Sequence, residues 1–418
     1  MSGADPARID LRGLVRPGDT VWWPQGSGEP TPLTAALVEQ RAELGPLTVF
    51  VATTLSTTLQ PEHADHIRFL GLGGLGETAR LSRLGLVEVL PVRIASLPAL
   101  LADGRLPIDV LFVQVTPPDE HGRCSLGVVT DYVAAAMDRA RTVVAEINAQ
   151  MPRTCGDTLV DAARFDHVVH TDRPLITAER RTPSDAIDAV AREVAARIPD
   201  GATLQLGIGA VPDALVPHLR SHTDLGAHSG MIGDWVPELV EAGVLTNARK
   251  PVDRGVTVTG AIFGSERLYR WADGNPTLRM RTLSGTHSAA ALAAQPDLFA
   301  VNSAIEVDLG GQVNAEMLGG RYVGGVGGQL DFARAACASM RGRSIVALPS
   351  TASAGRTTRI VARLADAVVT TPRADADLIV TEYGTADLRG ATLRERAARL
   401  IAIAHPAHRD ALERASRS

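Results

Sequence analysis

The sequence predicts an α/β protein made of two similar domains with mainly parallel sheets. Three observations support this prediction: short apolar runs, alanine-rich stretches of helical period between them, and an internal repeat. A strand of a parallel sheet is buried on both faces, so it reads as a continuous apolar run. Such runs are Thr48–Val51, Val110–Val113, Ser344–Leu348 and Leu378–Val380. Their alternation with helical stretches is typical of α/β units.

The segment after Pro183 shows how a helix of this fold is encoded. Ser184 can cap it, because its hydroxyl oxygen can accept a hydrogen bond from the first turn. Four apolar residues then recur at helical spacing and predict one buried face, namely Ile187, Val190, Val194 and Ile198. The run Pro199–Gly201 ends the helix, and a strand follows directly.

An internal repeat relates the two halves of the chain. Residues 18–30 and residues 200–212 each read as a turn, a strand, a Gly-x-Gly loop and the start of a helix. The polar stretch 171–183 fits an interdomain linker. We therefore expect an N-terminal domain at residues 1–180 and a C-terminal domain at residues 181–418.

Composition narrows the class of partner. The chain has 418 residues, 45% of them hydrophobic, and a formal net charge of −5, which is ordinary for a globular protein. The arginines are scattered among acids, so no nucleic-acid partner is expected. No apolar run approaches the roughly 18 residues of a membrane span, so no membrane partner is expected either.

The N-terminal residues and the cysteines indicate the cellular compartment and whether a metal is bound. The first residues lack the basic-then-apolar pattern of a secretion signal. Cys124, Cys155 and Cys337 are odd in number and have no metal-ligand spacing, which favours reduced thiols. We expect a cytoplasmic protein without a bound metal.

Two glycine-rich loops are candidates for binding a ligand. Gly207 and Gly209 lie between a strand and a helix, where backbone N–H groups can face an oxyanion or a phosphate. The loop is not a dinucleotide fingerprint, because Pro212 takes the place of the third glycine. The second loop, Gly324–Gln329, has four glycines in six residues before a helical stretch. A simple turn is the alternative interpretation of each loop.

Several longer motifs occur in a fixed order along the chain: Gly26–Pro30, Val115–Gly122, Met151–Thr154, Leu206–Ala214, Asn302–Leu309, Gly325–Phe332 and Thr381–Gly384. With these motifs the chain, from Met1 to about Ala411, resembles the acetyl-CoA hydrolase/transferase family, which includes the 4-hydroxybutyrate CoA-transferases. The resemblance implies two CoA-transferase-type (NagB/RpiA-like) α/β domains and a homo-oligomer, with a homodimer as the expected form. It also implies an acyl-CoA and a small acceptor as substrates, with no permanently bound cofactor.

The resemblance also assigns roles to the two loops. It implies that coenzyme A contacts eight residues, namely Gly207, Ile208, Gly209, Ala210, Val211, Gly324, Gly327 and Gly328. The N–H groups of Val211 and Gly328 would form an oxyanion hole for the thioester oxygen. Arg359 and Arg373 are further candidates for contacting the phosphates of coenzyme A, although a lone arginine is commonly a solvated surface charge.

The catalytic position departs from the family pattern. Relatives have a glutamate at the position of Gly230, and this carboxylate attacks the acyl-CoA and becomes a glutamyl-CoA thioester. Glycine offers no nucleophile. The resemblance leaves Glu382 as a candidate general base and Asn302 as a residue that orients the reacting groups. Glu29, on the equivalent loop of the first half, is a further candidate to face the cleft, with a structural role as the alternative.

His228 and Asp234 flank the glycine on either side. His228 is a candidate proton shuttle, with an ordinary hydrogen-bonding role as the alternative. For Asp234 we expect a helix cap, with a reach into the vacated space as the alternative.

Three functions follow from this pattern. The first is an enzyme that passes a small acyl group directly from CoA to water or to another small acceptor. The second is a CoA-transferase in which Glu382 or Asp234 takes the covalent role. The third is a non-catalytic protein that binds acyl-CoA.

Overall fold

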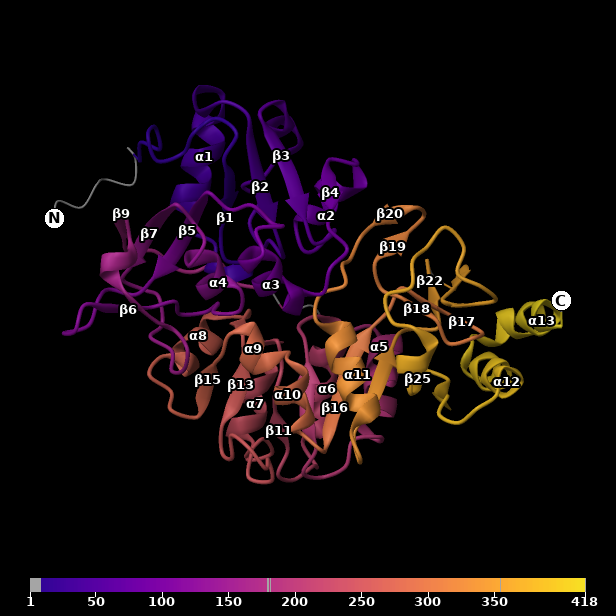
Figure 1. Cartoon of the computed structure of the whole chain (residues 1–418). Helices are drawn as coiled ribbons and strands as arrows, with labels where there is room; N and C mark the ends of the chain where they lie inside the picture. The colour runs from indigo at the N-terminus through magenta and orange to yellow at the C-terminus, as the bar shows by residue number, and fades with distance from the viewer. Residues whose placement is uncertain (1–8, 179, 181, 354, 418) are drawn as a thin grey trace. The chain divides into compact units, whose positions relative to one another are not determined.

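The computed structural model describes residues 9–178, 180, 182–353 and 355–417 (Figure 1). By their contacts the residues form two compact units. Unit 1 comprises Met1–Glu179, Val258–Thr286 and Arg321–Gly325, and unit 2 comprises Arg180–Thr257, His287–Gly320 and Val326–Ser418. Within the described ranges, no helix is long and apolar enough to cross a membrane.

Unit 1 is built on a parallel sheet of strand order β4-β3-β2-β1-β5-β7-β9. In chain order these strands are β1 Thr20–Trp22, β2 Leu47–Val51, β3 Ile67–Gly71, β4 Val87–Val89, β5 Val110–Val115, β7 Thr142–Asn148 and β9 His167–Thr171. The α-helices are α1 Thr31–Leu44, α2 Thr78–Arg83, α3 Leu97–Ala102, α4 Val133–Met137, α8 Glu266–Ala272 and α9 Leu283–Thr286. Shorter strands are β6 Arg123–Ser125, β8 Leu159–Asp161, β13 Thr257–Thr259, β14 Ala261–Ile262, β15 Leu278–Met280 and β20 Arg321–Tyr322.

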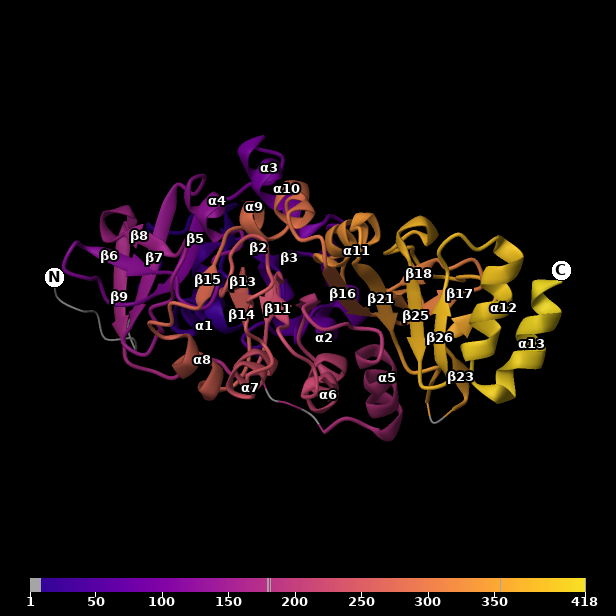
Figure 2. The same cartoon turned by 90° about the horizontal axis from the view of Figure 1, so that it is seen from below.

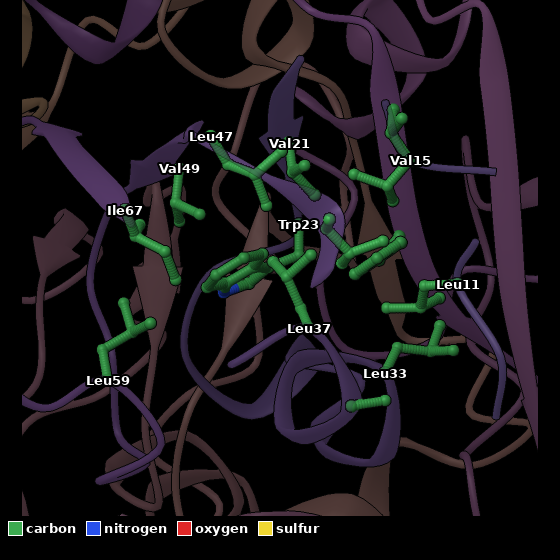
Figure 3. Close-up of a cluster of buried hydrophobic side chains, with 14 of the residues drawn as sticks. Leu11, Val15, Val21, Trp23, Leu33, Leu37, Leu47, Val49, Leu59 and Ile67 are labelled. Atoms are coloured by element: carbon green, nitrogen blue, oxygen red, sulfur yellow. The ribbon is translucent and has the colours of Figure 1, made fainter. Parts of the chain in front are cut away.

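The core of unit 1 forms where α1 covers the sheet (Figure 3). Leu33 and Leu37 of the helix are fully buried with Val21 and Val49 of the central strands. Trp23, at the end of β1, lies in the same cluster. Burying such side chains contributes roughly 1.5 to 3 kcal/mol each relative to exposure, so the apolar runs of the sequence stabilise this unit.

Unit 2 contains a sheet of order β11-β10-β16-β21-β25-β26, in which only the last pairing is antiparallel. Its strands are β10 Thr203–Leu206, β11 Gly226–Ala227, β16 Leu298–Ser303, β21 Arg343–Ala347, β25 Leu378–Thr381 and β26 Gly384–Asp387. Its helices are α5 Asp185–Ala195, α6 Ala210–Leu219, α7 Trp235–Glu241, α10 Ala289–Ala293, α11 Gln329–Ala338, α12 Leu393–Ile403 and α13 Pro406–Ser416. In Figure 2, α5 and α6 lie on one side of this sheet and α11 on the other.

Smaller strands complete unit 2. They are β12 Met231–Ile232, β17 Glu306–Asp308, β18 Val313–Asn314, β19 Met317–Leu318, β22 Thr351–Ala352, β23 Thr357–Thr358 and β24 Ile360–Val361. Strand β17 pairs with β18 and β24, and β22 forms a hairpin with β23. The predicted α/β class with mainly parallel sheets is confirmed.

The expected helix after Pro183 is α5. Ser184 caps it, because its hydroxyl oxygen accepts a hydrogen bond from the Ile187 amide at 3.4 Å. Val190 and Val194 of the predicted stripe are fully buried. The two copies of the repeat are also alike in structure, since β1 leads through Gly26–Gly28 into α1 and β10 leads through Gly207–Gly209 into α6.

The second unit does not contain all of the residues expected for the C-terminal domain. Unit 2 begins at Arg180, and Val258–Thr286 and Arg321–Gly325 belong to unit 1. The reason is pairing with the backbone of unit 1: the Thr130 amide donates to Gly260 O at 2.9 Å, and the Gly74 amide donates to Gly324 O at 3.1 Å. Such long-range pairing has no local sequence signal.

Candidate active site

The candidate site of unit 2 lies at the carboxyl edge of its sheet. In an α/β sheet, ligands bind outside the carboxyl ends of the parallel strands. Gly207–Gly209 follows β10, Gly230 follows β11, and Asn302 lies near the end of β16. Glu382 follows β25 on the same edge. The topology therefore explains why predicted residues that are far apart in the sequence end at one edge.

The loop after β10 is open. A Cβ atom placed on Gly207 or on Gly209 would meet no described heavy atom within 4 Å. Gly209 has φ +111°, in the region that favours glycine, and it is the N-cap of α6. The amides of Ala210 and Val211 belong to the first turn of this helix, where N–H groups have no intrahelical partner. The predicted oxyanion donor Val211 thus lies at a helix N-terminus, as anion binding requires.

The two halves of the second glycine loop have different surroundings. Gly324 and Gly325 pack against the backbone of unit 1, where a Cβ on Gly325 would approach Leu72 O to 2.2 Å. Gly327 has φ +52° and open space around it. Gly328 is the N-cap of α11. The part of this loop that can face a ligand is therefore Gly327 and Gly328.

Gly230 lies against the imidazole of His287. A Cβ atom on Gly230 would lie 2.5 Å from His287 Cε1 and 2.6 Å from Nε2, closer than real Cβ atoms come. A Cβ atom on Gly328 would lie 2.4 Å from the same Nε2. The ring of His287 therefore occupies the space toward which side chains at both glycines would point.

The His287 ring is buried beside Phe332 and near His228. It makes an edge contact with Phe332 of α11, with ring centroids 4.9 Å apart, and only 5% of His287 is exposed. Burial, with a smaller contribution from nearby His228, lowers the pKa of His287 to about 3. The imidazole is therefore neutral at neutral pH. The next residue, Ser288, caps α10 by accepting a hydrogen bond from the Ala291 amide at 3.2 Å.

Sequence reasoning did not select His287. It belongs to none of the motifs quoted above, and it lies just before the short helix α10, which contains no glycine. The signal that finds it is spatial: the ring lies between Gly230 and Gly328, which come from different segments of the chain.

His228 and Ser229 fix the chain that leads to Gly230. Both residues are buried, the His228 amide donates to Leu204 O at 3.0 Å, and Ser229 Oγ donates to Leu206 O at 2.8 Å. The structure thus gives His228 a buried place beside His287.

The expectation that Asp234 caps a helix is wrong in its detail. Asp234 does occupy the N-cap position of α7, but its carboxylate accepts no capping hydrogen bond. Its backbone has φ −60° and ψ −16°, which is helical, whereas a capping residue is normally extended. Burial raises the pKa of Asp213 of α6, and nearby Asp234 raises it further.

Asn302 is oriented by a paired amide. Its Nδ2 donates to Gln205 Oε1 at 3.0 Å, and Gln205 Nε2 donates back to Asn302 Oδ1 at 3.4 Å. Gln205 is on the neighbouring strand β10 and is 5% exposed. An amide has two donors and two acceptor lone pairs, so this pairing leaves capacity to hold a carbonyl or a water.

Glu382 lies further along the edge. Its carboxylate accepts hydrogen bonds from the amide and the hydroxyl of Ser350, at 2.7 and 2.6 Å. Strand β25 is four strands from β11 in the sheet order, and neighbouring strands are about 4.8 Å apart, which makes a separation of about 19 Å. The structure therefore brings Gly230, Gly328 and His287 together, while Glu382 follows a strand that is not adjacent to β11.

The remaining candidates have other surroundings. Glu29 in unit 1 is 1% exposed, and its carboxylate accepts hydrogen bonds from Ser56 and Thr34 within that unit. Arg359 is half-buried in unit 2, and this burial lowers the pKa of its guanidinium against the opposing pull of Glu382. The backbone amide of Arg373 donates to Gln312 at 2.6 Å.

The described residues contain no group of three His, Cys, Asp or Glu side chains arranged to hold a metal ion. Cys124, Cys155 and Cys337 are free thiols. Burial raises the pKa of Cys124 to about 11 and that of Cys337 to about 12, so neither is a thiolate nucleophile at neutral pH.

The fold and this site define a CoA-transferase-type protein, and comparison with known proteins gives its family. Residues 9–178 match the N-terminal domain of the acetyl-CoA hydrolase/transferase family, and residues 264–416 match the C-terminal domain. The chain belongs to this family. It is an enzyme of a family whose named members include CoA transferases and acetyl-CoA hydrolases.

Named relatives cover almost the whole chain. The 4-hydroxybutyrate coenzyme A transferase of Clostridium kluyveri is 39% identical over 388 residues, which are 92% of this chain and 90% of the relative. The succinyl-CoA:acetate/propanoyl-CoA:succinate CoA transferase of Fasciola hepatica is 35% identical, over 97% of this chain and 86% of its own.

Solved structures agree with these relatives. RipA of Yersinia pestis superimposes with a TM-score of 0.91 at 32% identity, over 98% of this chain and 99% of its own. The 4-hydroxybutyrate CoA-transferase of Porphyromonas gingivalis gives a TM-score of 0.82 at 35% identity, over 97% and 95% of the two chains.

Proposed function

We propose that the protein transfers the acyl group of a small carboxylic acyl-CoA directly to water or to a small acceptor, without a glutamyl-CoA intermediate. One observation carries this proposal: position 230 has no side chain, and the imidazole of His287 fills the space into which one would extend. The open loop at Gly207–Gly209 and the amides of Val211 and Gly328 support binding of the thioester.

The expected chemistry uses the protein to polarise the thioester carbonyl. Two N–H donors facing the developing oxyanion would each contribute about 100-fold or more to the rate, as in measured oxyanion holes. Asn302, oriented by Gln205, would hold the acyl carbonyl or the attacking water. Coenzyme A then leaves as a thiol, and the acyl group leaves as a carboxylic acid or as the product of the acceptor.

The test is release of free thiol from a panel of short and medium acyl-CoAs, measured with a thiol reagent. We expect release without added carboxylate, and no enzyme-CoA adduct by intact mass. If no acyl-CoA in the panel releases thiol while CoA still binds in the micromolar range by calorimetry, the protein is a binding protein and the proposal fails.

A second candidate is a CoA-transferase in which another carboxylate carries CoA. The names of the relatives favour it, since most of those described above are CoA transferases. It predicts an adduct of protein and CoA that hydroxylamine cleaves. Detection of that adduct after incubation with acyl-CoA would replace the direct mechanism by this one.

We also propose that the protein works in the cytoplasm as a homodimer or higher homo-oligomer. The free thiols of Cys124, Cys155 and Cys337 support a reducing compartment. Light scattering on the purified protein would give the mass of the assembly, and a mass of 44.0 kDa would contradict an oligomer.

A further inference from the structure

The space beside Gly230 holds a chemically competent group. A glutamate side chain at position 230 would begin with a Cβ atom, and that atom would lie 2.5 Å from His287 Cε1. A glutamate and this ring position exclude one another.

The ring is also placed against the second glycine loop. Its Nε2 is the atom nearest to a Cβ built on Gly328, at 2.4 Å. Gly328 is the residue whose amide is proposed to hold the thioester oxygen. An imidazole nitrogen therefore lies against the residue whose amide is proposed to hold the reacting carbonyl.

The surroundings keep the ring in one orientation. Phe332 contacts it at an interplanar angle of 63°, and Ser288 anchors the following helix α10 through its cap. Helix α10 packs on α11, which begins directly after Gly328. The glycines, the aromatic ring and the helix cap thus place the imidazole from several sides.

On the basis of the proposed function, we propose that His287 is the catalytic base of this enzyme and takes the functional place of the absent carboxylate at position 230. An imidazole nitrogen removes a proton from the attacking water or hydroxyl acceptor, whose oxygen forms a bond to the thioester carbon. The tetrahedral oxyanion then collapses, the carbon–sulfur bond breaks, and the CoA thiolate takes the proton back from the imidazolium. The products of hydrolysis are a carboxylic acid and CoA thiol, so atoms and charges balance.

Burial keeps the His287 ring neutral, and a neutral imidazole can accept a proton. The low pKa of His287 keeps the ring unprotonated before the reaction. Charging a buried imidazole is unfavourable by itself, but a negative charge within a few ångströms favours the charged form. The oxyanion at the Gly328 amide would supply that charge in the transition state, when the proton is transferred.

The first test compares His287→Gln and His287→Phe with the native enzyme. General-base catalysis contributes about 100-fold to 10,000-fold, so we expect thiol release to fall by that factor while CoA affinity and melting temperature change little. His218→Gln is the matched control, because this histidine pairs with Asp188 on α5. A further readout is rescue: added imidazole should restore part of the activity of His287→Ala, which leaves a hole of the same shape.

The second test uses the steric conflict between a side chain at position 230 and the ring of His287. Gly230→Glu alone should form no glutamyl-CoA adduct, because the ring blocks the side chain, whereas Gly230→Glu combined with His287→Ala should form an adduct that hydroxylamine cleaves. Suppose that the native enzyme releases thiol, and that a folded His287→Gln or His287→Phe variant releases thiol at the same rate. His287 is then not the base, although the proposed function stands. If the native enzyme is inactive on every acyl-CoA tested, the proposed function itself fails, and this inference fails with it.

Discussion

At the scale of single residues, two glycines without side chains leave the space that the imidazole of His287 occupies. Gly230 and Gly328 come from separate segments, and the space beside each contains the same ring nitrogen of His287. Cores are close-packed, so a side chain added at either glycine must displace the imidazole. The glycines are therefore better understood as partners of His287 than as flexible hinges.

The packing makes a prediction for Gly328→Ala. The added methyl would lie 2.4 Å from His287 Nε2, and overpacking of this kind costs roughly 1 to 3 kcal/mol. We expect a lower urea midpoint and a strong loss of thiol release. The matched control is Gly207→Ala, where the methyl meets no described atom within 4 Å and should leave the midpoint unchanged. Equal midpoints for the two variants would contradict the tight packing.

The buried imidazole also predicts a dependence of stability on pH. The pKa of His287 is lowered from 6.5 to about 3 in the folded state, so above pH 6.5 the ring is neutral in both states and adds no slope. Below pH 6.5 the unfolded chain binds a proton that the folded chain does not, so stability falls by up to about 1.4 kcal/mol per pH unit until pH 3. Nearby His228 also lowers the pKa of His287, although burial is the larger cause.

Urea unfolding at pH 7.5 and pH 5.0 measures this contribution. The loss of stability between the two values should be smaller in His287→Phe than in the native protein by about 2 kcal/mol. His218→Gln, which changes a histidine paired with Asp188, should retain the dependence due to His287. An unchanged loss in His287→Phe would show that the ring is protonated when folded.

At the scale of elements, strand order decides which predicted residues can work together. The carboxyl ends of β10, β11 and β16 are neighbours, whereas β25 lies further along the sheet. The sequence could predict the strands and the glycine loops, because buried runs and Gly-x-Gly turns are local signals. It could not predict that Glu382 and Gly230 follow strands that are not neighbours, because strand order is a property of the assembled sheet.

The same reasoning explains why His287 was missed. Its role depends on α10, α11 and the turn after β11 meeting in space, and no local spacing encodes such a meeting. Asp234 illustrates the converse case. Its sequence context indicates a capping residue, but the structure gives it a helical backbone at the start of α7 and a place near Asp213.

The strand order makes a prediction for Glu382→Gln. The substitution keeps the shape and an acceptor for Ser350 but removes the charge. Since Ser350 already holds this carboxylate and its strand is not adjacent to β11, we expect a change in kcat of less than about 10-fold, smaller than the loss expected for a general base. A loss as large as that of His287→Gln would return Glu382 to the role of base.

At the scale of the whole molecule, the glycine loops of the two copies of the repeat have different surroundings. In unit 1 the glycine loop is packed: a Cβ on Gly26 would lie 2.5 Å from Phe263, and one on Gly28 would lie 2.9 Å from Val129. In unit 2 the corresponding Gly207 and Gly209 are open. One fold element therefore serves as core in unit 1 and as a candidate ligand loop in unit 2, although the two sequences read alike.

This divergence predicts opposite effects of the same substitution in the two copies. Gly28→Val should destabilise unit 1, because its side chain has no room beside Pro24 and Val129 and overpacking costs roughly 1 to 3 kcal/mol or more. Gly207→Val should fold normally, because its side chain extends into open space, but it should weaken CoA binding by shielding the amides of the loop. Melting temperature and CoA calorimetry on both variants separate the two effects. If Gly207→Val bound CoA as tightly as the native protein, the open loop of unit 2 would not be the CoA site, and the assignment of Val211 as an oxyanion donor would fall with it.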